Sequence, residues 1–273
     1  MTPDRCYVIA EIGINHNGSL DLAKLLIDQA KKAGADAVKF QKRTVEVVYT
    51  PDELARPRES PFGNTNGDLK RGLEFSVEQY EDLNRYCKKV GIDWGVSCWD
   101  GASVDQMAVL QPNFLKVASA CLTDTSLLSH YYNTGIPTYL STGMSTWEEI
   151  DEAVKIVEPA CVLHCHSAYP SPLDELNLAV MESLKDRYSL PVGYSSHTVS
   201  PWPALMAAVR GAVVIEAHLT LDRSMFGSDQ AASLEPPAFA KLVEEIRTWE
   251  KVRGDGIKKV CASEAAVKAK LRR

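Results

Sequence analysis

The sequence predicts an α/β protein of the TIM-barrel class, a (β/α)8 barrel that forms a single domain. Eight short apolar runs alternate with helix-like segments along the 273 residues, which is typical of a closed parallel barrel. Each run ends in a polar or charged side chain, and the carboxyl ends of barrel strands converge on one mouth. The runs therefore predict an active-site rim at Glu11, Lys39, Ser97, Lys116, Ser141, His164, Ser195 and His218.

The expected strands lie at residues 7–11, 37–41, 92–97, 114–118, 137–141, 161–165, 191–195 and 213–218. The first and the last are β-branched and almost continuously apolar, as parallel strands covered on both faces are. Apolar residues recur at helical spacing over 22–33, 80–90, 150–157 and 239–249. Capping-box pairs predict helix starts at Ser76 with Gln79 and at Thr146 with Glu149.

Residues 42–75, between the second strand and its helix, form a connection that is much longer than the other connections in the chain. They are polar and contain three prolines and three glycines. Connections of this length in a compact domain are usually functional or disordered, and this one lies on the catalytic side of the barrel. We therefore predict a loop that covers the substrate. The barrel is expected over residues 1–255, followed by a C-terminal tail, 256–273, with a short solvated helix.

Composition and charge narrow the class of protein. Apolar residues make up 45% of the chain, which is enough for a full core, and the formal charge of −6 favours neither nucleic acid nor an anionic membrane as a partner. No apolar signal segment precedes the first strand and no run approaches 18 apolar residues, which predicts a cytoplasmic protein. The seven cysteines lack zinc-type spacing and are expected to be reduced core residues.

Two histidines are candidate metal ligands. His197 and His218 end the adjacent seventh and eighth strands, so their imidazoles can meet on one ion. Ordinary packed histidines remain the alternative. Two protein ligands would leave coordination positions open, as in a catalytic metal site. At the end of the sixth strand, His164 is expected to face the barrel wall, whereas His166 is left as a further rim candidate.

Lysines and hydroxyls on the same rim predict an anion site. Lys39 and Lys116 each close an apolar run, and an ammonium group in a partly buried mouth requires a counter-anion. With the hydroxyls of Ser97, Ser119, Ser141 and Ser195 they form a candidate pocket for phosphate and carboxylate groups. Glu11 ends the first strand, where a carboxylate suits a base or an acceptor for a sugar hydroxyl.

Taken together, these segments resemble the sialic acid synthase family, also called N-acetylneuraminate synthases, from about Tyr7 to Glu264. Several ordered motifs at matching strand ends carry the resemblance: residues 10–18, 38–41, 70–75, 116–119, 141–144, 167–170, 193–198, 220–223, 227–229 and 233–236. The family joins phosphoenolpyruvate to an aldose or N-acyl hexosamine. The products are phosphate and a nonulosonic acid or related 2-keto-3-deoxy sugar acid.

The resemblance also implies a role for each site residue. Phosphoenolpyruvate would contact Lys39, Ser97, Lys116, Ser119, Ser141 and Ser195. A divalent ion, Mn2+ or Mg2+, would be held by His197 and His218. The acceptor sugar would contact Glu11, Gln41, Tyr169 and Asp229. The implied catalytic set is Glu11, Lys39, Lys116, His197 and His218.

The chain departs from the family pattern at three points. Ala120 and Cys121 stand where the family has glycine and an acidic residue, and Gln230 stands where relatives often have histidine. The sequence also ends about where the family's C-terminal antifreeze-like domain would begin. These departures leave a homodimer and a separate antifreeze-like domain protein open as partners. Two other functions also stay open: a catalytically degenerate barrel that binds a ligand or partner protein, and a lyase with a Schiff-base lysine.

Overall fold

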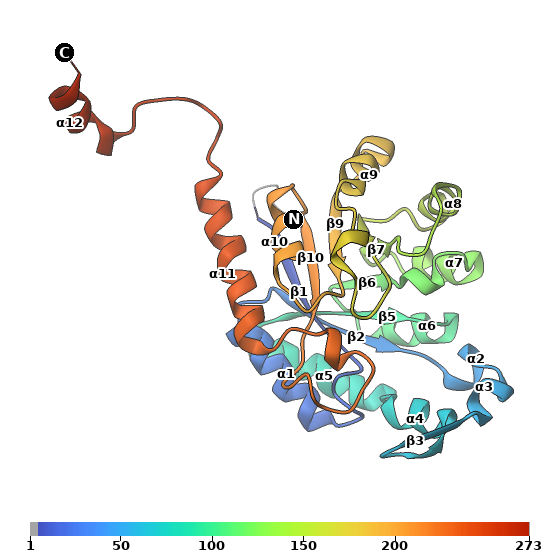
Figure 1. Cartoon of the computed structure of the whole chain (residues 1–273). Coiled ribbons are helices and arrows are strands. Elements are labelled where there is room, and N and C mark those ends of the chain that lie inside the picture. Colours follow the sequence, from blue (N-terminus) through green and yellow to red (C-terminus); the bar gives the residue numbers. More distant parts are fainter. Residues whose placement is uncertain (1–4, 273) are drawn as a thin grey trace.

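A computed structural model describes residues 5–272 and has a closed barrel of eight parallel strands (Figure 1). The order around the barrel is β1-β10-β9-β8-β7-β6-β5-β2, and β2 pairs again with β1. The fold prediction is confirmed, and each strand lies within two residues of its expected position. The strands are β1 (Tyr7–Gly13), β2 (Ala37–Lys42), β5 (Asp93–Cys98), β6 (Phe114–Val117), β7 (Thr138–Ser141), β8 (Cys161–Cys165), β9 (Val192–Ser196) and β10 (Val214–His218).

Helices surround the barrel and cover the outward faces of its strands. Ser76 and Thr146 begin α5 and α8 with the predicted capping boxes. Short 3-10 turns lie at η1 (Ser119–Cys121), η2 (Leu173–Glu175) and η3 (Gln230–Ala232). The surrounding helices are α1 (Leu20–Lys32), α5 (Val77–Val90), α6 (Gly101–Val109), α7 (Thr125–Asn133), α8 (Trp147–Val157), α9 (Val180–Tyr188), α10 (Trp202–Val209) and α11 (Pro236–Val252).

A small apolar cluster fills the floor of the barrel. Because side chains alternate along a strand, every second residue points inward. The inward residues near the amino ends of the strands are apolar and buried, and the rings of Phe114 and Tyr139 stack there with centroids 4.9 Å apart. The inward residues that follow them are polar. The cluster consists of Ile9, Ala37, Phe114, Tyr139, Cys161, Leu163 and Val214.

The connection between β2 and α5 is folded, so the prediction of a loop there is wrong. It contains α2 (Val45–Val48), α3 (Pro51–Ala55), a hairpin of β3 (Pro57–Ser60) and β4 (Gly63–Thr65), and α4 (Asn66–Leu73). Capping boxes at Thr50 with Glu53 and at Thr65 with Asp68 begin two of these helices. In Figure 1 the unit lies to one side of the barrel.

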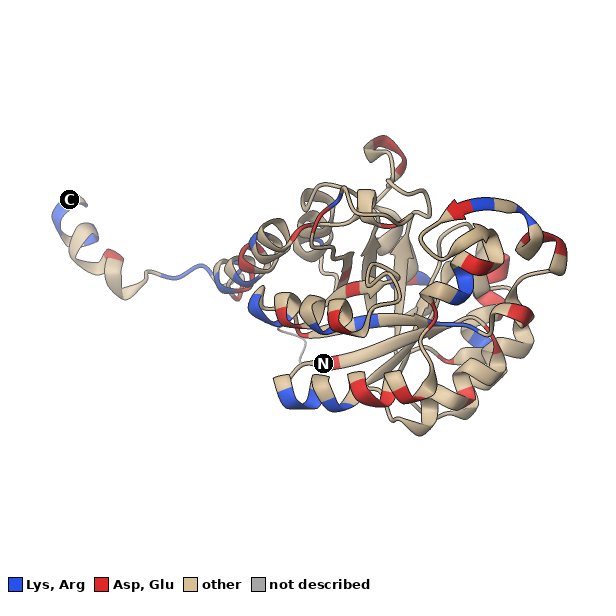
Figure 2. Cartoon of the chain, turned by 90° about the horizontal axis from the view of Figure 1, so that it is seen from below, with Lys and Arg blue, Asp and Glu red and all other residues tan. Residues whose placement is uncertain are grey.

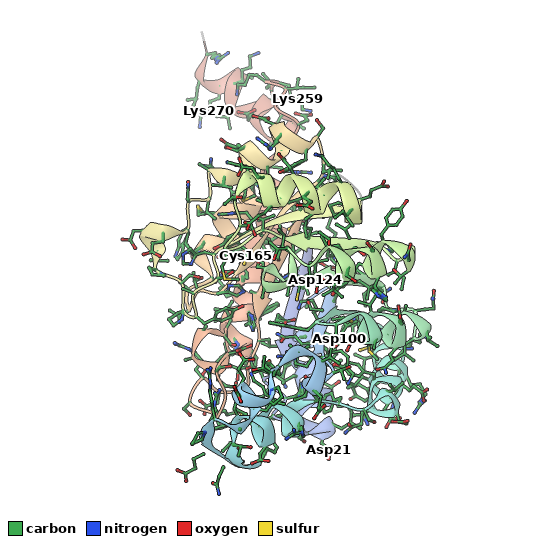
Figure 3. All side chains as sticks on the ribbon, turned by 90° about the vertical axis from the view of Figure 1, so that its right-hand side faces the viewer. Asp21, Asp100, Asp124, Cys165, Lys259 and Lys270 are labelled. Atoms are coloured by element: carbon green, nitrogen blue, oxygen red, sulfur yellow. The ribbon has the colours of Figure 1, made fainter. Side chains whose placement is uncertain are left out.

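The C-terminal segment lies apart from the barrel. Residues 251–272 are exposed, and α12 (Ala262–Leu271) forms the short solvated helix that was expected. Lys259 and Lys270 lie on this projecting segment (Figure 3), while basic and acidic residues are interspersed over the helices of the barrel (Figure 2). Within residues 5–272, none of the helices is both long and apolar enough to cross a membrane.

The loop after β1 is anchored by a buried neutral histidine. The ring of His16 is 2% exposed and stacks on Phe75 at 4.0 Å, and its Nδ1 accepts a hydrogen bond from the backbone of Gly18. Burial lowers the pKa of His16 to about 3. Below about pH 6.5, His16 is therefore protonated in the unfolded chain but stays neutral in the folded chain.

We therefore expect His16 to make the barrel less stable as the pH falls from about 6.5 towards 3. Relative to a His16→Phe variant, the wild type should lose about 2 kcal/mol of unfolding free energy between pH 7 and pH 5. Urea unfolding of both proteins across this range measures the difference. A gap between the two proteins that did not change with pH would contradict a neutral, buried His16.

Candidate active site

The polar inward residues line a cavity of about 150 Å³ at the carboxyl ends of the strands. None of residues 43–75 is among the residues that line it. Seven further residues line it that the sequence did not single out as a site: Trp99, Ala118, Ala120, Met144, Cys165, Ser167 and Glu216. The predicted residues in its lining are Glu11, Lys39, Gln41, Ser97, Lys116, Ser119, Ser141, Tyr169, His197 and His218.

Lys39 and Glu11 form a buried ion pair at one side of the cavity. The Lys39 ammonium lies 2.8 Å from Oε2 of Glu11 and donates to Ser97 at 2.9 Å. Burial raises the pKa of Glu11 to about 7, although Lys39 opposes the shift, and Glu216 adds to it. Burial would lower the pKa of Lys39, but the two carboxylates outweigh it and raise that pKa. Lys39 is therefore a charged ammonium, while Glu11 can exchange a proton near neutral pH.

Lys116 has a carboxylate partner that the sequence analysis missed. Its ammonium lies 2.6 Å from Oε1 of Glu216 and 3.3 Å from the hydroxyl of Ser195, which itself donates to Glu216 at 3.0 Å. Burial would raise the pKa of Glu216, but Lys116 and Lys39 outweigh it and hold that pKa at about 2. Alternation along β10 is the signal that identifies Glu216, because it lies two residues before the inward-facing His218.

The hydroxyl groups of the cavity differ in how they are used. Ser119 accepts a hydrogen bond from the backbone of Gly143 at 3.0 Å. Ser141 is 1% exposed, and its hydroxyl has no hydrogen-bond partner within residues 5–272. A buried hydroxyl without a protein partner costs free energy, so Ser141 is free to hydrogen-bond to a molecule in the cavity.

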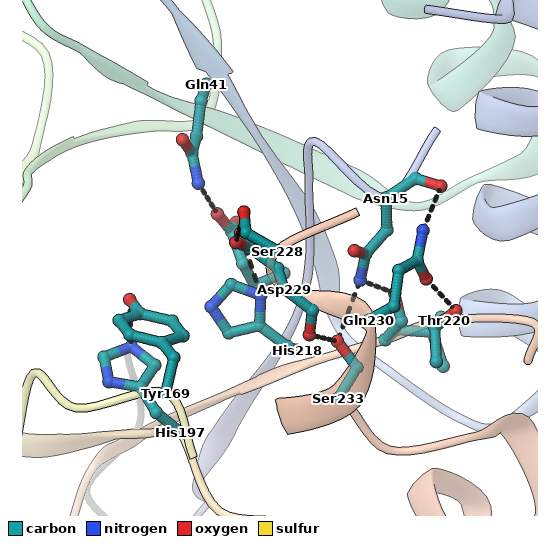
Figure 4. Close-up of polar contacts among 12 residues, drawn as sticks. Asn15, Gln41, Tyr169, His197, His218, Thr220, Ser228, Asp229, Gln230 and Ser233 are labelled. Carbon is teal, nitrogen blue, oxygen red and sulfur yellow. Dashed lines mark hydrogen bonds and ion pairs between the residues drawn. The ribbon is translucent and has the colours of Figure 1, made fainter. Parts of the chain in front are cut away.

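The two candidate metal ligands lie close together at the ends of the adjacent strands β9 and β10 (Figure 4). The ring centroids of His197 and His218 lie 5.4 Å apart. His197 Nδ1 lies 2.6 Å from the carbonyl oxygen of His166, and a carbonyl can only accept, so this nitrogen carries the proton. Nε2 faces the hydroxyl of Tyr169 at 2.8 Å. Burial would lower the pKa of His197, but Cys165 outweighs it and raises that pKa, so the ring has to give up the proton on Nε2 before it can bind a metal. An oriented imidazole of this kind suits a metal ligand.

His218 supplies the second half of this arrangement. Burial lowers its pKa to about 3, which keeps the imidazole neutral as a metal ligand must be. Its buried Nδ1 has no hydrogen-bond partner among the described residues, and Oδ2 of Asp229 lies 3.9 Å away. Among residues 5–272, no three His, Cys, Asp or Glu side chains converge as a metal site. The histidine pair thus offers two ligands, and an ion held there would depend on substrate or water for its remaining positions.

Gln230 holds the loop that carries Asp229. It is fully buried, accepts from the hydroxyl of Thr220 and donates to the backbone oxygen of Asn15 at 3.3 Å (Figure 4). Ser233 donates to the backbone oxygen of Asp229 at 2.7 Å and ties that residue to the same network. The side chain of Gln230 therefore has a structural role, behind the cavity lining. Ser195 and Asp229 likewise lie outside the lining and reach it through Glu216 and His218.

The histidines at the end of β8 lie outside the cavity lining. His164 contacts the carbonyl oxygen of Leu176 at 2.7 Å within the barrel wall, as expected. His166 lies 3.1 Å from Glu175, so the rim alternative is not supported as part of this cavity.

One cysteine does line the cavity, contrary to the expectation of core residues. Six of the seven free cysteines are buried, and Cys165 is the one that reaches the cavity lining. Its sulfur lies 3.8 Å from Nδ1 of His197. Burial would raise the pKa of Cys165, but the neighbouring His197 outweighs it and lowers that pKa to about 7.

Comparison with known proteins identifies the family of the chain. The NeuB family profile matches residues 26–258. Human N-acetylneuraminate-9-phosphate synthase is 38% identical over 273 residues, which cover 97% of this chain and 76% of that protein. N,N'-diacetyllegionaminic acid synthase of Legionella pneumophila is 37% identical, with 98% and 79% covered. A crystal structure of N-acetylneuraminic acid synthetase from Leptospira borgpetersenii has a TM-score of 0.86 at 31% identity, covering 99% and 94% of the two chains. On these grounds the chain belongs to the NeuB family.

Proposed function

We propose that the chain condenses phosphoenolpyruvate with an aldose or N-acyl hexosamine, releasing phosphate and a nonulosonic or related 2-keto-3-deoxy sugar acid. The observation that carries this proposal is the meeting of two buried lysines, a hydroxyl without a partner and an oriented histidine pair in one cavity. Family membership supports it, because relatives are named as synthases of sialic and legionaminic acids. A degenerate barrel is disfavoured, since such a barrel has no reason to keep this set together.

The lysine end of the cavity is proposed to hold the donor. Lys39 and Lys116 donate charge-assisted hydrogen bonds to its phosphate and carboxylate, with hydroxyl donors from Ser97, Ser119 and Ser141. Ser195 supports this end from behind the lining, through its hydrogen bonds with Lys116 and Glu216. Both lysines already face glutamates, so their charges are balanced within the cavity wall. Glu11, with its raised pKa, can take up a proton when a multiply charged anion enters.

The histidine end is proposed to hold the reacting aldehyde. His197 and His218 are the residues that would bind Mn2+ or Mg2+, and the ion would supply Lewis-acid polarisation of the aldehyde oxygen when bound. C3 of phosphoenolpyruvate forms a bond to the aldehyde carbon, water adds at C2, and phosphate leaves with its C–O bond broken. Glu11, Gln41, Tyr169 and Asp229 orient the sugar beside the lysines.

The charge state of the lysines argues against a Schiff-base lyase. A lysine nucleophile requires a neutral amine, which is normally obtained by a lowered pKa. Lys39 instead has a raised pKa, and Lys116 is paired with Glu216 at 2.6 Å. Both ammonium groups are better suited to binding an anion.

Phosphate release from phosphoenolpyruvate tests the proposed function. With Mn2+ present, we expect release that depends on a sugar and equals the amount of keto acid formed, across a panel of aldoses and N-acyl hexosamines. Boiled protein and omission of the sugar are the controls. If phosphoenolpyruvate bound in a calorimeter but no sugar in the panel caused phosphate release, the degenerate barrel would be favoured instead.

A further inference from the structure

Arg43 is a buried cation beside the cavity for which the proposed chemistry has no use. It follows β2 directly and is 6% exposed. Nη1 donates to the hydroxyl of Tyr49 at 2.9 Å, and Nε lies 2.9 Å from Oε1 of Glu74. The guanidinium carbon also lies 4.6 Å from the ring centroid of Trp99. These contacts hold the planar guanidinium group in one orientation and so fix the direction of its remaining donor, Nη2.

That remaining donor points at a side chain of the cavity lining. Nη2 of Arg43 donates to Oε1 of Gln41 at 2.5 Å, and Nε2 of Gln41 donates to Oε1 of Glu11 at 2.9 Å. A guanidinium can only donate, so Gln41 must turn its oxygen towards Arg43. Its nitrogen must then face Glu11 and the cavity. The amide of Gln41 is therefore held in one of its two possible orientations.

The backbone of Gly13 provides a second observation at the same place. Gly13 has a φ of +53°, and a Cβ added there would lie 3.0 Å from Nε2 of Gln41 and 3.0 Å from Oε1 of Glu11. The register of β1 shifts between Glu11 and Gly13, where the strand has an irregularity. The absence of a side chain at residue 13 lets the amide and the carboxylate meet beside the main chain.

We propose that Arg43 is a positioning residue that fixes the polarity of Gln41, so that this part of the cavity offers an N–H donor. The inference rests on the proposed function for the sugar that Gln41 contacts. A sugar must then present an oxygen acceptor here, such as a hydroxyl or an acyl carbonyl. A bare ammonium group at this position, which can only donate, is rejected because both groups would be donors.

A double-mutant cycle between Arg43 and Gln41 tests this role. Arg43→Met keeps a long side chain to pack on Trp99 but removes every donor. We expect kcat/KM for the acceptor sugar to fall about 10- to 100-fold, while KM for phosphoenolpyruvate changes less than about 3-fold. In a Gln41→Met background the same change should cost less than about 3-fold. An equal loss in both backgrounds would show that Arg43 does not act through Gln41.

Two further variants separate the Gln41 contact from charge and packing. Arg71→Met removes an exposed guanidinium of the neighbouring helix α4, which pairs with Glu46 at 2.8 Å, and leaves the contacts of Arg43 intact, so its acceptor kinetics should match the wild type. Arg43→Lys keeps the buried charge and covers the case in which Arg43→Met does not fold. A single ammonium paired with Glu74 cannot reproduce the several donors of the guanidinium group. We therefore expect kcat/KM for the acceptor sugar still to fall about 10-fold. Acceptor kinetics like the wild type in Arg43→Lys would overturn the proposal.

The side-chain amide signals of Gln41 give a test that does not require turnover. They can be assigned in NMR spectra by their loss in Gln41→Met. We expect them to exchange slowly with water in the wild type and at least about 10-fold faster in Arg43→Met. If this difference appeared while no sugar was turned over, the proposed function would fail and the positioning role would stand. Unchanged exchange in Arg43→Met would remove the positioning role whatever the activity.

Discussion

Replacing Lys116 with methionine is expected both to abolish tight donor binding and to destabilise the barrel. The change leaves Glu216, which is 2% exposed, without the ammonium that lies 2.6 Å away. Removing one partner of a buried ion pair costs about 3–5 kcal/mol of folding stability. Loss of a buried charged hydrogen bond should weaken phosphoenolpyruvate binding by about 2–5 kcal/mol. Denaturant unfolding and calorimetry measure the two effects separately.

A second substitution separates stability from binding. In the double variant Lys116→Met with Glu216→Gln, both charges are gone, so most of the lost stability should return. Affinity for phosphoenolpyruvate should stay low, because the ammonium is still absent. If the double variant bound the donor as tightly as the wild type, Lys116 would not be part of the donor site.

Replacing His218 with alanine is expected to eliminate binding of divalent metal and turnover while the barrel stays folded. His218 is 4% exposed, and its Nδ1 has no hydrogen-bond partner that the substitution would leave unpaired. An ion with open coordination positions also contributes little to folding. Calorimetric titration with Mn2+ and circular dichroism on the protein without substrate check both parts of the prediction.

A neighbouring histidine provides the matched control. His166 lies at the end of β8 but outside the cavity lining, so His166→Ala should keep Mn2+ binding. The bond that orients His197 survives this change because it uses the backbone carbonyl of residue 166. Undiminished Mn2+ affinity in His218→Ala, or full activity in a strong chelator, would rule out the metal assignment.

The barrel could be predicted because its signal is repeated. Eight alternations of apolar run and amphipathic segment leave little choice of fold, and alternation within each strand places its inward side chains. The unit at residues 45–73 lacked such a signal. Its helices are four, five and eight residues long, too short to show a helical period. The capping residues Thr50 and Thr65 were the available evidence for them.

Most residues of the site could be predicted individually from the sequence, but the contacts between them could not. The sequence places Lys116 on the rim, yet its partner Glu216 lies 100 positions further along the chain. Such a pairing depends on which strands stand opposite each other across the barrel. Asp229 posed a similar problem, since a loop held by the buried Gln230 brings it towards His218. Cys165 was overlooked because its strand is apolar throughout, although alternation from Cys161 and Leu163 in the barrel floor places it on the same inward face.

The filled floor of the barrel determines the order in which two substrates can be loaded. Because the rings of Phe114 and Tyr139 stack below the cavity, substrates have to enter and leave at the carboxyl ends of the strands. Lys39 is 2% exposed and Tyr169 is 47% exposed, so the proposed donor end is the deeper one. Phosphoenolpyruvate must then enter first, and a sugar seated above it blocks its escape. Steady-state kinetics should accordingly be ordered and sequential, with the donor as the leading substrate.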